Sequence, residues 1–217
     1  HAPRAGRARD ARPRGGGGMT TEQVFRTVVG LPEDPTTVDA DAFREAMGSF
    51  PAAVSVITAL DEDETPRGLT CSAFCSLSAE PPLVLACVNQ RNGSLRAIRH
   101  SGGFVVNLLR AGSHDVSARF ASPVEDKYDG VAWEPSPESG LPRLSDDASA
   151  HLDCRLVADI AAGSHAILIG GIRTCGSEAH ERCSPLLYWR RAYGSWSAAD
   201  DLSHDPTAPE AEGGPTA

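Results

Sequence analysis

The feature that most constrains the fold of this chain is a succession of short, strand-length apolar segments separated by polar or glycine-containing turns. Several of these segments alternate apolar and polar residues, which is typical of half-buried strands. Many short strands with few helices predict a mainly β protein, built as a closed or nearly closed antiparallel barrel. The predicted strands are residues 54–58, 70–78, 83–88, 104–109, 151–159, 165–173 and 186–190.

Three short helices are expected between these strands. The first has Asp39 as a plausible N-cap and carries apolar residues at helical spacing on one face, namely Ala40, Phe43, Met47 and Phe50. Residues 94–100 and 114–120 form the second and third helices. The stretch 121–144 is rich in Pro, Asp and Gly, which predicts a long loop with short regular pieces.

One domain is expected over residues 35–196. Residues 1–34 are expected to be disordered or to derive from added sequence, because the first 18 hold five arginines and end in four glycines. Residues 197–217 are expected to form a disordered tail, since they contain little that could be buried.

Charge and cysteine content exclude several classes of protein. The net charge is −9: the first 18 residues carry about +4 and the rest of the chain about −13, and this acidic body argues against nucleic acid as a partner. No apolar stretch approaches the roughly 20 residues needed to cross a membrane. The six cysteines form no C-x-x-C pair and follow no signal peptide, so a reducing, cytoplasmic setting is expected.

The common catalytic motifs are absent from the sequence. It contains no G-x-G-x-x-G after a strand, no phosphate-binding G-x-x-x-x-G-K-[ST], and no G-x-S-x-G nucleophile elbow. It also lacks H-E-x-x-H and paired C-x-x-C, so no metal site is expected. These absences favour a barrel that takes its chemistry from a bound cofactor.

Two segments are candidates for holding such a cofactor. In residues 70–78, strand alternation places Cys71, Ala73, Cys75 and Leu77 on one face and a polar face opposite, made of Thr70, Ser72, Phe74, Ser76 and Ser78. On the spacing alone, a strand with one hydrated face is the favoured explanation of this pattern. In residues 88–94, Arg91 and a helix N-cap at Ser94 could bind a phosphate, although a plain capped turn has the same sequence. His165 taken alone is more often a turn histidine than a catalytic one.

Read together, several blocks over residues 39–196 resemble the short-chain flavin reductase family. Their order and spacing make the resemblance specific, whereas any single block would be weak. The blocks are Phe43-Arg44-x-x-Met47-x-x-Phe50-Pro51, Val54-x-Val56-Ile57-Thr58, Gly68-Leu69-Thr70-Cys71-Ser72-Ala73-Phe74-Cys75-Ser76-Leu77-Ser78, Pro81-Pro82-Leu83-Val84, Gly102-x-Phe104-x-Val106-Asn107, Gly163-Ser164-His165 and Pro185-Leu186-Leu187-Tyr188-x-x-x-x-Tyr193-Gly194.

The resemblance implies an FMN-binding split barrel that forms a homodimer with flavin near the subunit interface. It implies an NAD(P)H-dependent enzyme that reduces FAD or FMN by hydride transfer. Many such enzymes supply reduced flavin, by diffusion, to a partner monooxygenase. Separately, the Ala-, Arg- and Gly-rich composition is typical of high-GC actinobacterial chains, in which such pairs often serve natural-product biosynthesis. The acidic body offers no obvious site for a 2′-phosphate, so NADH is favoured over NADPH.

The resemblance also implies the site residues. Thr70, Ser72, Ala73 and Phe74 would contact the isoalloxazine ring, and His165 would act as the catalytic residue that positions the nicotinamide. The ribityl phosphate would lie along residues 87–94. The remaining cofactor-binding residues implied are Val56, Cys71, Ser76, Cys87, Val88, Asn89, Arg91, Ser94, Lys127 as a phosphate or flavin contact, and Tyr193, which would close the site. The thiols of Cys71 and Cys75 are expected to pack away from the flavin.

The sequence departs from the family at three places, and the first is Ala53, where the family often has Gly. The usual acid before the histidine is Ser164 here, which removes a carboxylate that would raise the pKa of the imidazole. Leu95-Arg96 stands where a further hydroxyl is common. Two alternatives remain open at this point: an oxidase similar to pyridoxamine-phosphate oxidase, and a non-catalytic flavin- or haem-binding module.

Overall fold

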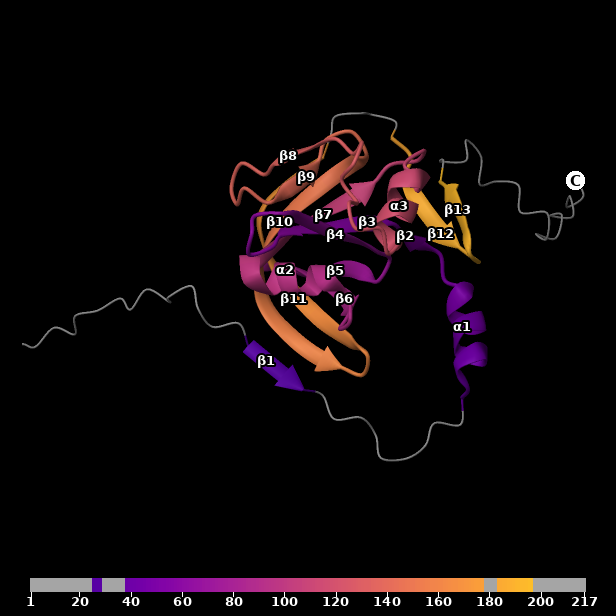
Figure 1. Cartoon of the computed structure of the whole chain (residues 1–217). Helices are drawn as coiled ribbons and strands as arrows, with labels where there is room; N and C mark the ends of the chain where they lie inside the picture. Colours follow the sequence, from indigo (N-terminus) through magenta and orange to yellow (C-terminus); the bar gives the residue numbers. More distant parts are fainter. Residues whose placement is uncertain (1–24, 29–37, 178–182, 197–217) are drawn as a thin grey trace, which may run out of the picture.

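The computed structural model describes residues 25–28, 38–177 and 183–196 of the 217-residue chain (Figure 1). Its helices are α1 (Ala40–Gly48), α2 (Gly93–Ser101) and α3 (His114–Ala121). Its strands are β1 (Phe25–Val28), β2 (Ala52–Ala53), β3 (Ser55–Leu60), β4 (Pro66–Cys71), β5 (Phe74–Ala79), β6 (Pro82–Asn89), β7 (Gly103–Leu109), β8 (Trp133–Pro135), β9 (Pro142–Leu144), β10 (Ala148–Ala162), β11 (His165–Ser177), β12 (Leu186–Trp189) and β13 (Ala192–Ser195).

The main sheet closes on itself because one stretch of chain changes partners. Its strand order is β4-β3-β7-β10-β11-β6-β5, and β5 continues directly from β4. β4 pairs with β3, whereas β5 pairs with β6, so the two ends of the sheet are joined by the chain itself. At the junction the Cys87 N–H donates to the Ala73 carbonyl at 2.9 Å. The prediction of a mainly β, antiparallel barrel is therefore confirmed.

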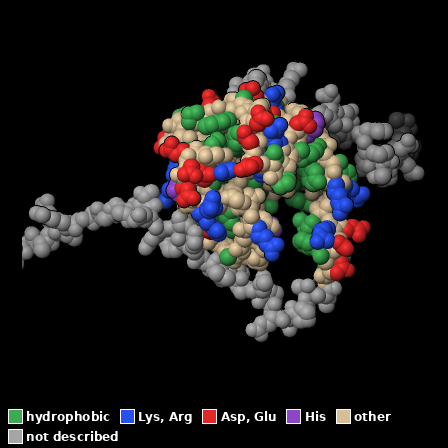
Figure 2. All heavy atoms as spheres, viewed as in Figure 1, with side chains coloured by type: hydrophobic (Ala, Val, Ile, Leu, Met, Phe, Trp, Pro, Cys, Tyr) green, Lys and Arg blue, Asp and Glu red, His purple; other side chains and the backbone are tan. Residues whose placement is uncertain are grey.

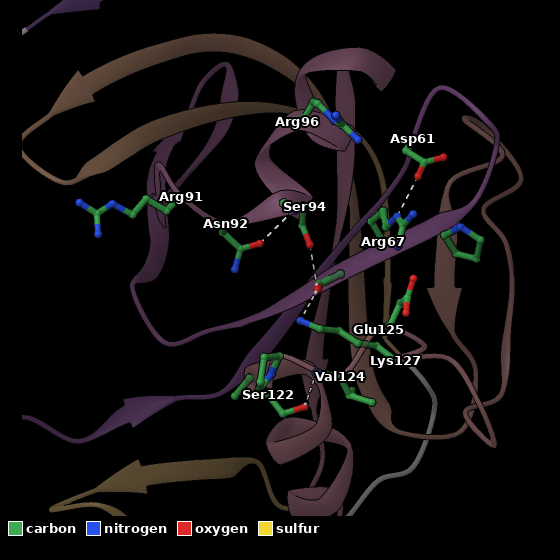
Figure 3. A pocket seen from close by; sticks show the side chains of 15 residues that line it. Asp61, Arg67, Arg91, Asn92, Ser94, Arg96, Ser122, Val124, Glu125 and Lys127 are labelled. Carbon is green, nitrogen blue, oxygen red and sulfur yellow. Dashed lines mark hydrogen bonds and ion pairs between the residues drawn. The ribbon is translucent and has the colours of Figure 1, made fainter.

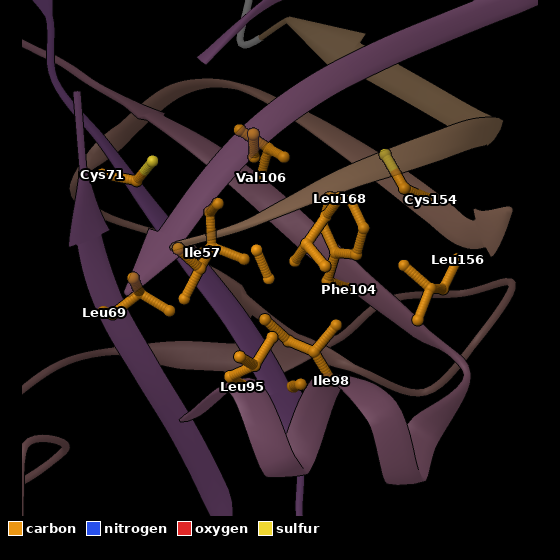
Figure 4. Close-up of a cluster of buried hydrophobic side chains, with 14 of the residues drawn as sticks. Ile57, Leu69, Cys71, Leu95, Ile98, Phe104, Val106, Cys154, Leu156 and Leu168 are labelled. Carbon is orange, nitrogen blue, oxygen red and sulfur yellow. The ribbon is translucent and has the colours of Figure 1, made fainter. Parts of the chain in front are cut away.

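The barrel is filled by one large apolar cluster, and α2 covers one opening. Leu95 and Ile98 point from α2 toward Phe104 and Ile57 in the interior, and all four side chains are fully buried (Figure 4). Burial of side chains of this size stabilises the fold by about 1.5–3 kcal/mol each. An ion pair between Arg99 Nε and Asp159 Oδ2, 2.7 Å long, also fastens α2 to β10.

A second cluster lies between the barrel and α3, where Phe120 packs with Val54, Val56 and Leu144. Gly68 on β4 lies against this cluster, because a Cβ added there would be 2.5 Å from Phe120 Cε1. The absence of a side chain at residue 68 thus lets α3 pack directly onto β4.

The helices match their predicted positions, with one correction at α2. Asp39 caps α1 as predicted, since its Oδ1 accepts from the backbone N–H groups of Asp41 and Ala42. The N-cap of α2 is Asn92 and not Ser94: the Asn92 Oδ1 accepts from the Ser94 N–H at 2.9 Å. The prediction was wrong by two residues because both side chains are good N-caps and the local sequence does not separate them.

The predicted continuous strand over residues 70–78 is wrong. Regular pairing stops at Ser72 and Ala73, where the chain leaves β3 and joins β6. As a consequence the predicted alternation does not continue across the junction. Cys71 is buried as expected, but Cys75 is exposed and does not pack in the core.

The domain boundary and the tail are only partly covered by the described residues. β1 pairs in parallel with residues 158–161 of β10, although it lies inside the 1–34 segment that was expected to be outside the domain. The predicted tail, 197–217, lies outside the described residues. Within the described chain, no helix is long and apolar enough to cross a membrane.

Candidate active site

A cavity of about 640 Å³ opens beside the N-terminus of α2 (Figure 3). Three segments that are far apart in the sequence form its walls: the β3–β4 turn with the start of β4, the first turns of α2 with the residues before it, and the loop after α3. Its lining includes Asp61, Pro66, Arg67, Gly68, Arg91, Asn92, Gly93, Ser94, Arg96, Ala121, Ser122, Pro123, Val124, Glu125 and Lys127.

The cavity carries more positive than negative charge. Arg67 is neutralised by Asp61, whose Oδ2 accepts from Arg67 Nε at 2.8 Å, and this hydrogen bond holds the pKa of Asp61 below its usual value. The guanidinium groups of Arg91 and Arg96 have no hydrogen-bond or ion-pair partner among the described residues. Figure 2 shows basic side chains at the surface over α2. An anionic ligand is the natural partner of such a wall.

Lys127 closes one side of the cavity and is held in place by the backbone. Its Nζ donates to the Phe120 carbonyl at 2.8 Å, near the C-terminal end of α3, and to the Gly68 carbonyl at 3.2 Å. Burial lowers the pKa of Lys127. Because an ammonium group has three donors, one N–H remains for a ligand. The Gly68 carbonyl also accepts from Ser94 Oγ at 2.8 Å, so it ties α2 and Lys127 to β4.

The β4–β5 junction presents a different surface. Ser72 and Ala73 are exposed, as is Ser76 on β5, whereas Phe74 is half-buried and packs on the core. Thr70 lies on β4, two residues before Ser72, and its side chain points toward α3, because its Oγ1 donates to the Ser117 carbonyl at 2.6 Å.

Thr70 and Tyr193 meet at the same residue of α3. The Ser117 Oγ and the Tyr193 hydroxyl are hydrogen-bonded at 3.0 Å, and the Tyr193 ring packs at 5.2 Å from that of Tyr188. This connection links Tyr193, through Ser117, to the β4 residue that lies just before the junction.

The turn between β10 and β11 carries His165 and is fixed by Gln90. The Gln90 side chain donates to the Gly163 carbonyl at 2.9 Å, and its backbone N–H donates to the Ser164 carbonyl at 3.0 Å. His165 pairs with Asn89 across β11 and β6. Its Nδ1 is hydrogen-bonded to Ser164 Oγ at 2.9 Å, and the ring is exposed. The tip of this turn is therefore adjacent to the segment that leads into the cavity.

The structure groups the predicted site residues into neighbouring sets. Arg91, Ser94 and Lys127 line the cavity, Asn89 lies beside His165, and Thr70 connects to Tyr193. The side chains of the remaining predicted residues on β3, β4 and β6 are less accessible: Val56 and Val88 are fully buried, Cys71 is buried, and Cys87 is half-buried. Any contact of Val56, Cys71 or Val88 with a ligand must therefore use the backbone.

Sequence reasoning missed several residues that shape the site. Arg67 and Gln90 act through contacts with distant segments, and Ser117 lies on α3 with no motif to mark it. Among the described residues, no group of three or more His, Cys, Asp or Glu side chains is arranged to hold a metal ion.

Comparison with known proteins gives consistent matches over this domain. A family described as flavin reductase like domain matches residues 47–197. The chain is 46% identical over 173 residues to "Flavin reductase (NADH)" of Kitasatospora aureofaciens, covering 79% of this chain and 90% of that protein. It is 37% identical over 156 residues to "Flavin-dependent monooxygenase, reductase subunit HsaB" of Mycobacterium tuberculosis, covering 72% of this chain and 82% of that protein.

A solved structure agrees with these relatives. The NADH:FAD oxidoreductase SgcE6 of Streptomyces globisporus, in complex with NAD and FAD fragments, superposes with a TM-score of 0.69 at 30% identity. The superposition covers 75% of this chain and 96% of that one.

Proposed function

The chain belongs to the flavin reductase like family, and we propose that it is an NAD(P)H-dependent flavin reductase that supplies reduced FAD or FMN to a monooxygenase. Relatives of the chain carry the names of an NADH flavin reductase and of a monooxygenase reductase subunit. NADH is the favoured reductant in this proposal.

The observation that carries the proposal is the short path along the chain, from Cys87 to Arg91, that leads from the exposed junction to the basic cavity. Cys87 on β6 is hydrogen-bonded to Ala73, and β6 then ends at Asn89, two residues before Arg91. An extended ligand lying on this path would place one end at Ser72 and Ala73 and an anionic end among the cations. A ribityl phosphate with a planar ring has this composition.

The residues present fit a flavin at this place. Arg91 and Lys127 would hold its phosphate end, because both are cationic and line the same cavity, whereas the Ser94 hydroxyl already donates to the Gly68 carbonyl and acts by tying α2 to β4. The backbone at Ser72 and Ala73 would lie against the ring, where polar groups stabilise the charge that develops on reduction. A bound flavin supplies the acceptor for the hydride of the nicotinamide.

His165 would position the nicotinamide from the opposite side of the path. Its ring orientation is set by Ser164 Oγ, which cannot stabilise an imidazolium through charge as a carboxylate would. His165→Ala should raise the Michaelis constant for NADH by about 10-fold, the loss of roughly one hydrogen bond. Flavin affinity should stay unchanged. His100→Ala, an exposed histidine at the end of α2, is the matched control. Unchanged kinetics in His165→Ala would remove His165 from the mechanism.

The direct test of the function uses the purified full chain with NADH or NADPH and each of FAD, FMN and riboflavin. The loss of reduced-nicotinamide absorbance should be rapid with at least one pair. No oxidation with any pair would end the reductase proposal, and a Soret band in the purified protein would favour the haem-binding alternative instead.

A homodimer is part of the same proposal. α1 stands apart from the barrel and has no buried residue (Figure 1). Its apolar side chains Phe43 and Met47 are therefore exposed, with relative accessibilities of 60% and 51%. A nine-residue helix with a solvated apolar face is marginal alone in water, so a second copy covering it would stabilise it. The exposed Phe50, Trp189 and Tyr193 extend this surface.

Sedimentation should give a dimer, and Phe43→Asp together with Met47→Asp should shift the chain toward the monomer. A fully active wild-type monomer would refute the dimer.

The six cysteines are all free, which supports a reducing, cytoplasmic location.

A further inference from the structure

The cations of the α2 cavity point in different directions. Arg91 and Arg96 extend away from one another, with Ser94 between them, and Arg96 is directed toward the end of the cavity formed by Asp61 and Arg67 (Figure 3). Lys127 comes from the loop after α3, and its Nζ donates to the same Gly68 carbonyl as Ser94 Oγ. A single phosphate bound by Lys127 and Arg91 would leave the Arg96 end of the cavity without an anion.

The Arg96 end is open and chemically suited to a second anion. Arg96 is exposed and has no ion-pair partner among the described residues, whereas Arg67 next to it already pairs with Asp61. A guanidinium without a carboxylate partner is a good donor to phosphate, because its planar fork binds two oxygens at once.

The same cavity offers an apolar surface next to its cations. Pro123 and Val124, in the loop after α3, are exposed and form part of the lining with Pro66. At about 640 Å³, the cavity lies within the usual size range of small-molecule sites and has space for more than one phosphate group. A flat aromatic base beside a second phosphate would bury this surface.

We propose that Arg96 is a specificity-determining residue that binds the second phosphate of FAD, so that the protein selects FAD over FMN. The adenosine would lie against Pro123 and Val124. This proposal rests on the proposed function, because it assigns the first phosphate of the flavin to Lys127 and Arg91.

The test measures binding without turnover, from the change in flavin fluorescence on titration with the full-length protein. Wild-type protein should bind FAD at least about 5-fold more tightly than FMN. Arg96→Gln should weaken FAD binding by about 10-fold, as expected for one charge-assisted hydrogen bond, and should change FMN affinity by less than about 2-fold. Arg155→Gln, at an exposed β10 arginine outside the cavity, should leave both affinities unchanged.

ADP probes the added half of the ligand by itself. It should compete with FAD in the wild type and lose that competition in Arg96→Gln. Equal losses for FAD and FMN would overturn the proposal, because Arg96 would then bind the phosphate they share. No loss for either flavin would also overturn it.

A third outcome would identify a different source of the anion. If Arg96→Gln raises the Michaelis constant for NADPH but leaves FAD binding intact, the group bound is the 2′-phosphate of NADPH, and the FAD assignment is wrong. Failure of the proposed function is distinguishable, because Arg96-dependent FAD binding without NAD(P)H oxidation would remove the reductase activity alone.

Discussion

Gly68→Ala should be among the most damaging single-methyl additions to this protein. A Cβ at residue 68 would lie 2.5 Å from Phe120 Cε1, 2.7 Å from Phe120 Cδ1 and 3.3 Å from the Ile57 carbonyl oxygen. Atoms cannot approach so closely, so either the Phe120 ring or the strand must move.

The ring has little space into which it can move. Phe120 is 1% exposed, and Tyr128 packs edge-on against it with ring centroids 5.1 Å apart. The Tyr128 hydroxyl in turn donates to the Arg67 carbonyl at 3.1 Å. Overpacking of a well-filled core costs about 1–3 kcal/mol, and this confinement places Gly68→Ala at the upper end, about 2–3 kcal/mol. For a domain of this size the melting temperature should fall by about 5–10 °C.

Urea unfolding followed by circular dichroism measures the effect, with Gly93→Ala as the matched control. Gly93 lines the same cavity, but a Cβ there meets nothing within 4 Å, so its stability should change by less than about 1 kcal/mol. FAD affinity should fall in Gly68→Ala, since the Gly68 carbonyl holds both Ser94 and Lys127.

A double-mutant cycle with Phe120→Leu tests the cause. The smaller side chain should relieve the clash, so the double mutant should be at least about 1 kcal/mol more stable than the sum of the single effects predicts. Additivity within about 0.5 kcal/mol would refute the reasoning, because the methyl group and the ring would then not interact.

Three further predictions concern other parts of the chain. Arg191 has a φ of 64°, in the left-handed region, so Arg191→Gly should raise the free energy of unfolding by about 0.5–1 kcal/mol in urea; a loss of stability would contradict this. The hydrogen bond from Arg67 lowers the pKa of Asp61, so its stabilisation is present above the unfolded pKa of about 3.9 and is lost as pH falls through the folded pKa. Asp61→Asn should therefore show a shallower decline in stability between about pH 5 and pH 2, and an unchanged acid profile would rule out this contribution. Burial raises the pKa of Cys154 to about 12, so iodoacetamide at neutral pH should alkylate the exposed Cys175 and spare Cys154 until the protein unfolds, as read by peptide mass spectrometry.

The fold was predictable where the signal is local. Apolar periodicity and the Asp39 cap are properties of neighbouring residues, and they located α1 and most of the barrel strands. The break at Ser72 and Ala73 was not predictable in this way, because the chain there changes from pairing with β3 to pairing with β6. The exposure of Cys75 follows from the same exchange, so the alternation rule failed there as well.

The site was predictable to a similar extent. Arg91, Ser94 and Lys127 were named from the sequence, and the structure places all three around one cavity. Arg67 and Gln90 were not, because their positions depend on which distant segments face them. Gln90 reaches Gly163 only because β6 pairs with β11, and no local pattern encodes that pairing.

The exchange of partners at the β4–β5 junction has a consequence for the order of folding. The β3–β4 and β5–β6 pairs join neighbouring segments, as do β10 and β11, so these ladders can form early at low loop-closure cost. The seam between β6 and β11 joins segments far apart in the chain and closes the ring of strands. The pairing of β6 with β11 is therefore expected to form late in folding. As a consequence, His165 reaches Asn89 only when the barrel is complete. In a partly folded chain, the β4–β5 junction and the β10–β11 turn would already have formed locally. They would lie at opposite edges of a sheet that has not yet closed.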